Sequence, residues 1–331
     1  MLEIQSCSRC DSPAVIHQPY SGQHLCQVHL AQSIRKRTSK ALRAQLELPS
    51  DARDEKGNAA VILVCISGGK DSAVLLDMMV NIVGDRRDVE LVCGCVDEGI
   101  EGYRAPSLEC ARQLAQRHQV RFETVSYPEL GFERMDEVVN RLPLIHLNHP
   151  QTKGMAPCSF CGVFRRQGLN HLAERVGAQV LALGHNLDDM AQTVLMNMQK
   201  GDVERTLRLA PHTTDPIEGI PPRIVPLRWI PEQEVHACAM ALDLPFFHDE
   251  CPHAAGALRQ RNRQMVALLE QDVPGSRHGL VHMVDAIKEL ERTVPHESRP
   301  QPPKPCPLCG SPASGEICKA CEFRAMLDET A

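Results

Sequence analysis

Short apolar runs alternate with longer amphipathic stretches from Ala59 onward, and this alternation predicts most of the fold. The apolar runs are rich in β-branched residues, so we expect each to be a buried strand. They lie at Val61–Ile66, Val89–Val96, Val120–Val125, Gln179–Leu183 and Arg223–Leu227. The amphipathic stretches predict helices at Ser72–Val83, Pro106–His118, Gly162–Val176, Leu187–Gln199 and Glu232–Leu242. Such alternation is typical of a doubly wound α/β fold with a parallel sheet.

Polar segments follow three of the predicted strands. They are SGGKDS at 67–72, the segment that begins Asp97-Glu98, and GHNLDD at 184–189. Ligands in doubly wound sheets bind beyond the carboxyl ends of the strands, so we expect these segments to share one site. Asp97 and Glu98 are candidate ribose or metal contacts, or simple turn residues. The acidic pair in GHNLDD is either catalytic or an ordinary preference for negative charge at a helix start.

The segment at 67–72 has the composition of a phosphate-binding turn. Gly68 and Gly69 allow a sharp turn and close approach of a ligand to the backbone. The helix that follows directs its free N–H groups at the turn, which favours an anion there. A Walker A loop is excluded because Asp71 stands where Ser or Thr is needed, and the dinucleotide fingerprint is excluded because Ser72 replaces its third Gly.

Length and charge narrow the class of protein. The chain has 331 residues, enough for one large core domain with small appendages. Its net charge of −6 gives no overall basic field, so any RNA-binding surface must be local. We find no apolar run long enough to span a membrane and no apolar core of a signal peptide, and we therefore expect a cytoplasmic protein. Fifteen cysteines in such a protein indicate metal binding.

A C-x2-C…C-x2-H pattern at the N-terminus predicts a structural zinc site. Its ligands are Cys7, Cys10, Cys26 and His29, with His24 as an alternative ligand. So small a segment cannot bury a sufficient core, and bound zinc supplies folding free energy of about 10–16 kcal/mol in comparable finger peptides.

The C-terminus repeats the pattern as a Cys₄ ribbon. Cys306 and Cys309 form one pair, Cys318 and Cys321 the other, and nearby glycines supply turns. We therefore expect two Zn²⁺ ions in the chain.

Three further cysteines form a separate group: Cys158, Cys161 and Cys251. Pro157 before them and a helix after them predict that the first two lie on an exposed turn. Three thiolates suit a [4Fe–4S] cluster with one iron left open, and they equally suit a persulfide carrier that forms disulfides. The pattern itself leaves the two alternatives open.

Basic residues concentrate in two predicted helices, Ala31–Leu48 and Ala254–Leu269. The first carries Arg35, Lys36, Arg37, Lys40 and Arg43. It is either an RNA-contacting face or a solvated one, which charge runs usually are.

The composition divides the chain into five parts. They are an N-terminal zinc module at 1–30, a basic helix and linker at 31–58, the α/β domain at 59–250, a helical segment at 251–299, and a C-terminal zinc ribbon at 300–331 that begins with the Pro-rich stretch Pro300–Pro305.

The SGGKDS turn resembles the PP-loop of the N-type ATP pyrophosphatases, in the adenine nucleotide alpha hydrolase-like class. Nearly the whole chain resembles the tRNA 2-thiolation enzymes. Within that family, PCSFCGVFRRQGL at 157–169, GHNLDDMAQTVLMN at 184–197 and KGDVER at 200–205 resemble the wobble-uridine branch of archaeal and eukaryotic cytosolic enzymes. The branch that thiolates uridine 54 is similar but has Lys in place of Arg165.

The resemblance implies an ATP-dependent tRNA uridine 2-sulfurtransferase. Lys70 would bind phosphate, Asp71 would orient Mg²⁺, Asp189 would be the catalytic carboxylate, and the three cysteines would hold an oxygen-sensitive [4Fe–4S] cluster. The implied ATP contacts are Ser67, Gly68, Gly69, Lys70, Asp71, Ser72, Asp97, Gly184, His185 and Asp189.

The resemblance further implies partners and a sulfur source. Sulfur would come from a ubiquitin-like carrier protein or free sulfide, and the enzyme would act as a homodimer or with a noncatalytic partner. Alternatives are thiolation of uridine 54, an amidotransferase-type synthetase acting on a small metabolite, and an RNA-binding protein with a degenerate ATPase core.

Overall fold

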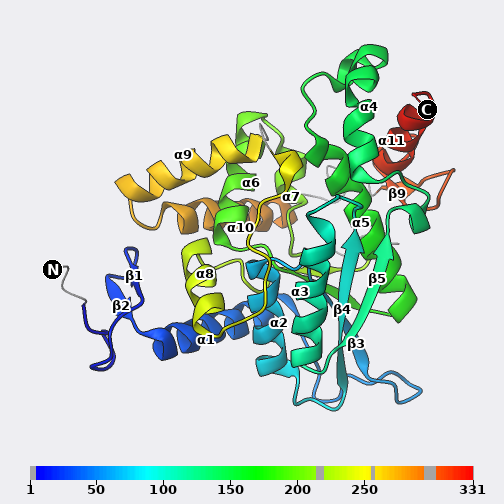
Figure 1. Ribbon diagram of the computed structural model, residues 1–331. Coiled ribbons are helices and arrows are strands. Elements are labelled where there is room, and N and C mark those ends of the chain that lie inside the picture. Colours follow the sequence, from blue (N-terminus) through cyan, green and yellow to red (C-terminus); the bar gives the residue numbers. More distant parts are fainter. Residues whose placement is uncertain (1–4, 214–219, 255–257, 294–302, 331) are drawn as a thin grey trace.

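The central element is a five-stranded parallel sheet. A computed structural model describes residues 5–213, 220–254, 258–293 and 303–330 (Figure 1). The strands are β3 (Ala60–Cys65), β4 (Val89–Asp97), β5 (Arg121–Ser126), β6 (Val180–Leu183) and β7 (Arg223–Ile224), in the order β5-β4-β3-β6-β7. The chain therefore builds outward from β3 in one direction and then returns to β3 to build in the other. The predicted doubly wound fold is confirmed, and its switch point lies between β3 and β6.

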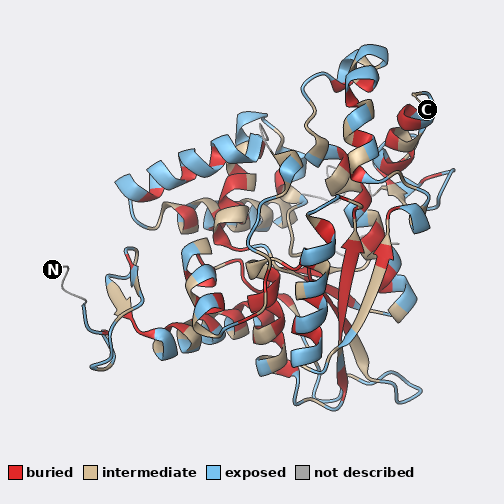
Figure 2. Ribbon diagram, viewed as in Figure 1, coloured by how far each residue is buried: buried red, intermediate tan, exposed pale blue. Residues whose placement is uncertain are grey.

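Each face of the sheet is covered by helices, because β3 alternates its side chains between two apolar layers. Ile62 and Val64 pack with α1 (Gln27–Gln45), α2 (Lys70–Val83), α3 (Arg104–Arg117) and α8 (Glu232–Ala241). Leu63 packs on the other face with α4 (Met135–Asn148), α5 (Pro157–Val176) and α11 (Lys319–Asp328). Figure 2 shows the central strands buried and the outer sides of these helices exposed.

A second group of helices packs against α6 (Leu187–Gln199). It consists of α7 (Val203–Leu207), α9 (Leu258–Asp272) and α10 (Ser276–Thr293), and α9 and α10 lie along α6 (Figure 1). Leu187 and Met190 of α6 pack with Val281 of α10 in a small apolar cluster of their own. The predicted basic helix at 254–269 is therefore described from Leu258, since residues 255–257 lie outside the described ranges.

The terminal modules are small. Strands β1 (Ile16–Gln18) and β2 (Gln23–Leu25) form an N-terminal hairpin, and β8 (Lys304–Pro305) pairs with β9 (Pro312–Ala313) near the C-terminus. The end of the predicted Pro-rich stretch is thus strand β8, while Pro300–Pro302 lie outside the described residues. The ring of Phe323 in α11 stacks on that of Phe160 in α5, with centroids 4.1 Å apart. The C-terminal module is therefore packed against the helix that carries the CxxC pair.

Two helix starts differ from the sequence prediction by more than two residues. Helix α5 begins at Pro157 instead of Gly162, so the prediction of a turn before the helix is wrong, and Cys158 and Cys161 are the second and fifth residues of α5; Cys158 is exposed, as predicted. Proline is favoured at the first helical position, where its missing N–H costs nothing. Helix α1 begins at Gln27 instead of Ala31, directly after Cys26.

Helix α4 was not predicted, and it contains Pro143. The remaining short elements are the 3₁₀ turns η1 (Pro128–Leu130), η2 (Pro150–Thr152) and η3 (Pro252–Ala254). Within the described ranges, no helix is both long and apolar enough to cross a membrane.

Candidate active site

The turn after β3 is held open toward the start of α2. Gly68 has φ +89°, and a Cβ there would lie 1.9 Å from the carbonyl oxygen of Ser107, so only glycine fits. The Ser72 hydroxyl accepts a hydrogen bond from Ser67 N (3.1 Å) and donates one to Gly69 O (2.9 Å). Gly69 caps α2 without a side-chain hydrogen bond, which leaves the first amides of the helix available to an anion.

Lys70 lies between two carboxylates. Its Nζ is 3.1 Å from Asp71 Oδ2 and 2.8 Å from Glu232 Oε1, where Glu232 is the first residue of α8. Burial alone would lower the pKa of Lys70, but Asp71 and Glu232 raise it above its usual value. Lys70 is therefore a firmly charged cation at the phosphate turn.

The turn after β6 approaches the phosphate turn closely. A Cβ at Gly184 would lie 3.3 Å from both Cα and N of Ser72. Asn186 caps α6 by accepting a hydrogen bond from Asp189 N (3.0 Å), and its amide donates to Asp71 Oδ1 (2.9 Å). Asn186 thus links Asp71 to Asp189, so the two candidate metal-orienting carboxylates lie on adjoining turns at the switch point of the sheet.

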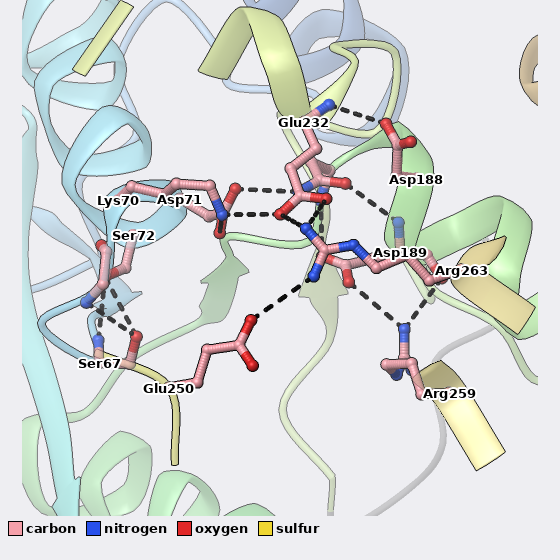
Figure 3. Close-up of polar contacts among 12 residues, drawn as sticks. Ser67, Lys70, Asp71, Ser72, Asp188, Asp189, Glu232, Glu250, Arg259 and Arg263 are labelled. Carbon is pink, nitrogen blue, oxygen red and sulfur yellow. Dashed lines mark hydrogen bonds and ion pairs between the residues drawn. The ribbon is translucent and has the colours of Figure 1, made fainter. Parts of the chain in front are cut away.

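Three arginines of the helical segment form ion pairs at this site, and the sequence pattern did not reveal their partners. Figure 3 shows two of them, Arg259 and Arg263. Arg259 pairs with Asp189 (3.3 Å) and Arg263 with Glu232 (3.0 Å), both from α9. Arg277 of α10 pairs with Asp188 (2.8 Å), and Asp188 Oδ2 accepts a hydrogen bond from Glu232 N (2.7 Å). Asp188 therefore has a structural role, whereas Asp189 remains the better candidate for chemistry. The spacing of Arg259 and Arg263, one helical turn apart, is the signal that could have placed both on one face.

The acidic residues at the end of β4 stabilise the loop that follows this strand. Asp97 Oδ1 accepts a hydrogen bond from Gly99 N (2.9 Å), which is the turn role that the sequence left open. Glu98 is buried and forms an ion pair with Arg104 Nε (2.8 Å), so it is unavailable as a ribose or metal contact. His185, by contrast, is exposed beside the site.

The cysteine trio comes from α5 and from the segment just before η3. Cys158 and Cys161 are the second and fifth residues of α5, and Cys251 lies just before η3. Cys158 Sγ is 4.0 Å from the carbonyl oxygen of His253, and the Tyr127 hydroxyl donates to the carbonyl of Cys161 (2.9 Å). Burial raises the pKa of the Cys251 thiol, and the nearby thiolates of the CxxC pair raise it further.

The spacing of the trio distinguishes between kinds of metal centre. In two places among the described residues, the ligand atoms of Cys, His, Asp or Glu side chains all lie within 4.8 Å of one another. These are the N-terminal and the C-terminal set, and the trio is not among them. A single tetrahedral ion needs such close ligands. The trio is therefore spaced more widely than the ligands of a single tetrahedral zinc ion.

The N-terminal set has the geometry of a tetrahedral metal site. His29 Nδ1 lies 3.3, 3.5 and 3.4 Å from the sulfurs of Cys7, Cys10 and Cys26, and the sulfurs of Cys10 and Cys26 are 3.8 Å apart. Tetrahedral zinc with Zn–S bonds of about 2.3 Å implies ligand separations of about 3.5–3.8 Å. The His24 ring instead stacks on His17, so His29 is the better ligand.

The C-terminal set is equally close. Cys309 Sγ and Cys318 Sγ are 3.5 Å apart, and all four sulfurs lie within 4.8 Å of one another. The amide of Cys318 lies 3.4 Å from the sulfur of Cys306, and it lowers the pKa of that thiol to about 6. The closeness of the four sulfurs therefore allows them to hold one metal ion together.

The basic face of α1 is only partly free. Arg37 pairs with the buried carboxylate of Glu234 and donates a hydrogen bond to Tyr20 Oη (2.9 Å). Arg35 donates to the carbonyl of Asn81 (2.8 Å). Lys36 and Lys40 are exposed, and the described residues offer neither of them a carboxylate partner. Arg37 is therefore part of the contact between α1 and α8, and the possible RNA face is smaller than the sequence suggested.

The fold and the glycine turn after β3 define an α/β protein of the PP-loop class. Residues 6–31 match the family model for the N-terminal LIM domain of 2-thiouridine synthetase TtuA. The chain is 37% identical over 324 residues to tRNA 2-thiolation protein NcsA of Haloferax volcanii, covering 96% of this chain and 97% of that protein. It is 34% identical over 329 residues to cytoplasmic tRNA 2-thiolation protein 1 of Bos taurus, covering 99% and 88%. The chain belongs to the tRNA 2-thiolation family of enzymes.

A solved structure agrees with this assignment. The U34-tRNA thiolase NcsA from Methanococcus maripaludis, determined with its [4Fe-4S] cluster, superposes with a TM-score of 0.76 at 29% identity. The match covers 97% of this chain and 96% of that one.

Proposed function

We propose that this chain is an ATP-dependent tRNA uridine 2-sulfurtransferase that makes 2-thiouridine at wobble position 34. The observation that carries the proposal is the meeting of a phosphate turn, Lys70, Asp71 and Asp189 at one sheet edge. The cysteine trio lies beside this edge. Relatives that match over nearly the whole chain are named for tRNA 2-thiolation, and a solved relative is named as a U34-tRNA thiolase.

The first step is activation of the base by ATP. Oxygen O2 of the uridine attacks the α-phosphorus, the bond to the β-phosphate breaks, and pyrophosphate leaves. The amides at the start of α2 bind the phosphates, and Lys70 offsets the negative charge that develops on the leaving group. Asp71 and Asp189 would hold Mg²⁺, which supplies further positive charge at the phosphates. Ser67, Gly68, Gly69 and Ser72 shape the turn, and Gly184 and His185 border it.

The second step replaces oxygen by sulfur. AMP is now bonded to the former O2, so a sulfur nucleophile that attacks C2 displaces AMP together with that oxygen. Cys158, Cys161 and Cys251 would hold a [4Fe–4S] cluster, which when bound supplies one iron without a protein ligand as a place for sulfide. Arg165 lies next to Cys161, with 3.4 Å between Nη2 and Sγ, and contributes positive charge where an anionic nucleophile is needed.

Other components of the proposal are structural or concern partners. Each terminal set would bind one structural Zn²⁺ ion, through Cys7, Cys10, Cys26 and His29 and through Cys306, Cys309, Cys318 and Cys321. We keep the five parts proposed from the sequence, in which the two zinc modules occupy residues 1–30 and 300–331. The sulfur donor is a ubiquitin-like carrier protein or free sulfide, and the active form is a homodimer. The enzyme works in the cytoplasm, as the names of its cytoplasmic relatives suggest.

The test is thiolation of a defined tRNA. Protein purified without oxygen and loaded with iron and sulfide is incubated with ATP, Mg²⁺, sulfide and an unmodified tRNA transcript. We expect 2-thiouridine by mass spectrometry of nucleosides, and its loss when uridine 34 of the transcript is replaced by cytidine. Thiolation that persists in that transcript but is lost on replacing uridine 54 would assign the enzyme to position 54. Thiolation of neither site would contradict the proposed activity.

A further inference from the structure

Lys70 and Arg263 share one carboxylate. Glu232 Oε1 lies 2.8 Å from Lys70 Nζ and 3.0 Å from Arg263 Nη2, and the guanidinium lies equally close to Glu232 Oε2 (Figure 3). Lys70 stands at the phosphate turn of the α/β domain, whereas Arg263 comes from α9 in the helical segment. The helical segment therefore places a second cation beside the cation that the turn itself provides.

The contact between Arg263 and Glu232 differs from the deeper ion pair in the same region. The side chains of Arg263 and Glu232 are 55% and 21% exposed, whereas those of Arg277 and Asp188 are 8% and 15% exposed. An exposed ion pair contributes little stability and can be exchanged for another partner. The Arg277 pair is therefore a fixed support for Glu232 and α6, and the Arg263 pair is free to change partners.

A polyphosphate is a better partner for Arg263 than one carboxylate. The guanidinium fork matches the oxygens of phosphate as well as those of a carboxylate, and a polyphosphate offers more negative charge than one carboxylate. The neighbouring Glu250, with 3.8 Å between Oε1 and Arg263 Nη1, adds negative charge on the other side of the same guanidinium. Arg263 is thus held at the mouth of the site by acidic groups that an arriving phosphate chain can replace.

We propose that Arg263 is a second phosphate-binding cation, which leaves Glu232 when ATP binds and, with Lys70, contacts the β- and γ-phosphates. Glu232 is then the resting partner of both cations. The inference rests on the proposed function, because it needs ATP at the turn. It goes further by assigning a phosphate contact to the helical segment outside the α/β domain.

The test compares two arginines of the same helix. Binding of the nonhydrolysable analogue α,β-methylene-ATP and of AMP is measured on full-length, metal-loaded protein with Mg²⁺ and without tRNA. Arg263→Gln should weaken binding of the analogue roughly tenfold or more, the effect of losing a charge-assisted hydrogen bond, and leave AMP binding unchanged. Arg261→Gln is the matched control, because Arg261 is exposed on α9 and has no ion-pair partner among the described residues. It should change neither affinity.

A second variant guards against a misfolded protein. Glu232→Gln removes the carboxylate that competes with phosphate, so it should bind the analogue more tightly than the parent. Weaker binding would show that Glu232 serves the ligand directly and would overturn the exchange. Analogue binding that Arg263→Gln leaves unchanged, with or without loss of tRNA affinity, would overturn the phosphate role while the proposed function stands. A parent protein that does not bind the analogue would instead overturn the proposed function as well.

Discussion

Glu98 and Arg104 form an ion pair inside the protein, with 2.8 Å between Glu98 Oε2 and Arg104 Nε and side chains only 4% and 5% exposed. The other oxygen of Glu98 lies 2.7 Å from Arg165 Nη2. Arg104 Nη1 donates a hydrogen bond to the carbonyl of Ser67 (2.8 Å), and Arg165 reaches Cys161. One buried carboxylate therefore connects the phosphate turn to the helix that carries the CxxC pair.

Glu98→Gln should destabilise the protein strongly. It leaves the buried guanidinium of Arg104 without its counter-charge, and breaking a buried pair costs about 3–5 kcal/mol. Unfolding by urea, followed by circular dichroism, measures the change in the free energy of unfolding. Glu101→Gln is the control, because this exposed residue of the same loop should change stability by about 0.5 kcal/mol at most. Equal free energies of unfolding for the two variants would show that the Glu98–Arg104 ion pair does not stabilise the protein.

Lys70→Ala or Asp71→Ala should abolish thiolation and leave the fold intact. Both side chains are partly exposed at a ligand-binding turn, so their loss removes phosphate and Mg²⁺ contacts without opening the core. The measurements are the 2-thiouridine content of tRNA from a strain that carries each variant, and the melting temperature of the purified protein. Lys56→Ala, in the exposed linker, is the control. Normal 2-thiouridine levels in either turn variant would sink the assignment of the ATP site.

The chain should bind two zinc ions that survive replacement of Cys158 by Ser. Each terminal set is complete without the trio, whose thiols are too far apart for a single tetrahedral ion. Elemental analysis of the purified protein measures zinc per chain. Cys7→Ser and Cys306→Ser should each remove about one ion. Loss of zinc in the Cys158 variant would overturn this division of the cysteines.

The basic face of α1 should separate into a structural and an RNA-binding part. Arg37→Ala should lower the free energy of unfolding, because the carboxylate of Glu234 is buried and loses its charged partner. Lys36→Ala with Lys40→Ala should leave stability unchanged and weaken tRNA binding. Each lost phosphate contact should reduce the slope of log K against log salt by about 0.7–0.9. If the double variant keeps the slope of the parent, this face is merely solvated.

The cysteine trio should require iron for activity. Exposure to air should inactivate the enzyme, and iron with sulfide should restore it, if the three thiols hold a cluster. Under the alternative persulfide chemistry, mild thiols alone would restore activity, and an alkylating agent would modify a trio cysteine in the active enzyme. Loss of the absorption of the cluster on replacing Cys251 by Ser is the spectroscopic check. Full activity of iron-free protein would end the case for a cluster.

Sequence patterns were sufficient where the signal is local. The apolar run at Val61–Ile66 and the glycines after it located β3 and the phosphate turn, and the predicted helix Leu187–Gln199 has the observed bounds of α6. The start of α5 was misplaced because Pro157 was interpreted as lying before the helix, although proline favours the first helical turn. Helix α4 was missed because a proline within a helix usually indicates its end.

Pairs of charges across the chain could not be predicted. Arg277 and Asp188, or Arg37 and Glu234, are far apart in sequence and meet only after α10 and α1 have packed. The sequence made Glu98 a candidate ligand contact because it follows a predicted strand whose end should lie at the ligand-binding edge. Its ion pair with Arg104, which packs back against β4, could not be predicted. Sequence reasoning therefore predicted which turns meet at the sheet edge, and the structure was needed to separate the candidate ligand contacts from residues that support the fold.

The stacking of Phe323 on Phe160 has a practical consequence for handling the protein. Phe323 comes two residues after Cys321, and Phe160 comes immediately before Cys161, so one pair of rings joins the C-terminal metal ligands to the CxxC pair. If the C-terminal set holds Zn²⁺ as proposed, a strong chelator that strips this ion would loosen the ring contact and the first turn of α5 with it. Enzyme preparations made with such chelators would then lose activity for a reason that adding iron alone does not repair.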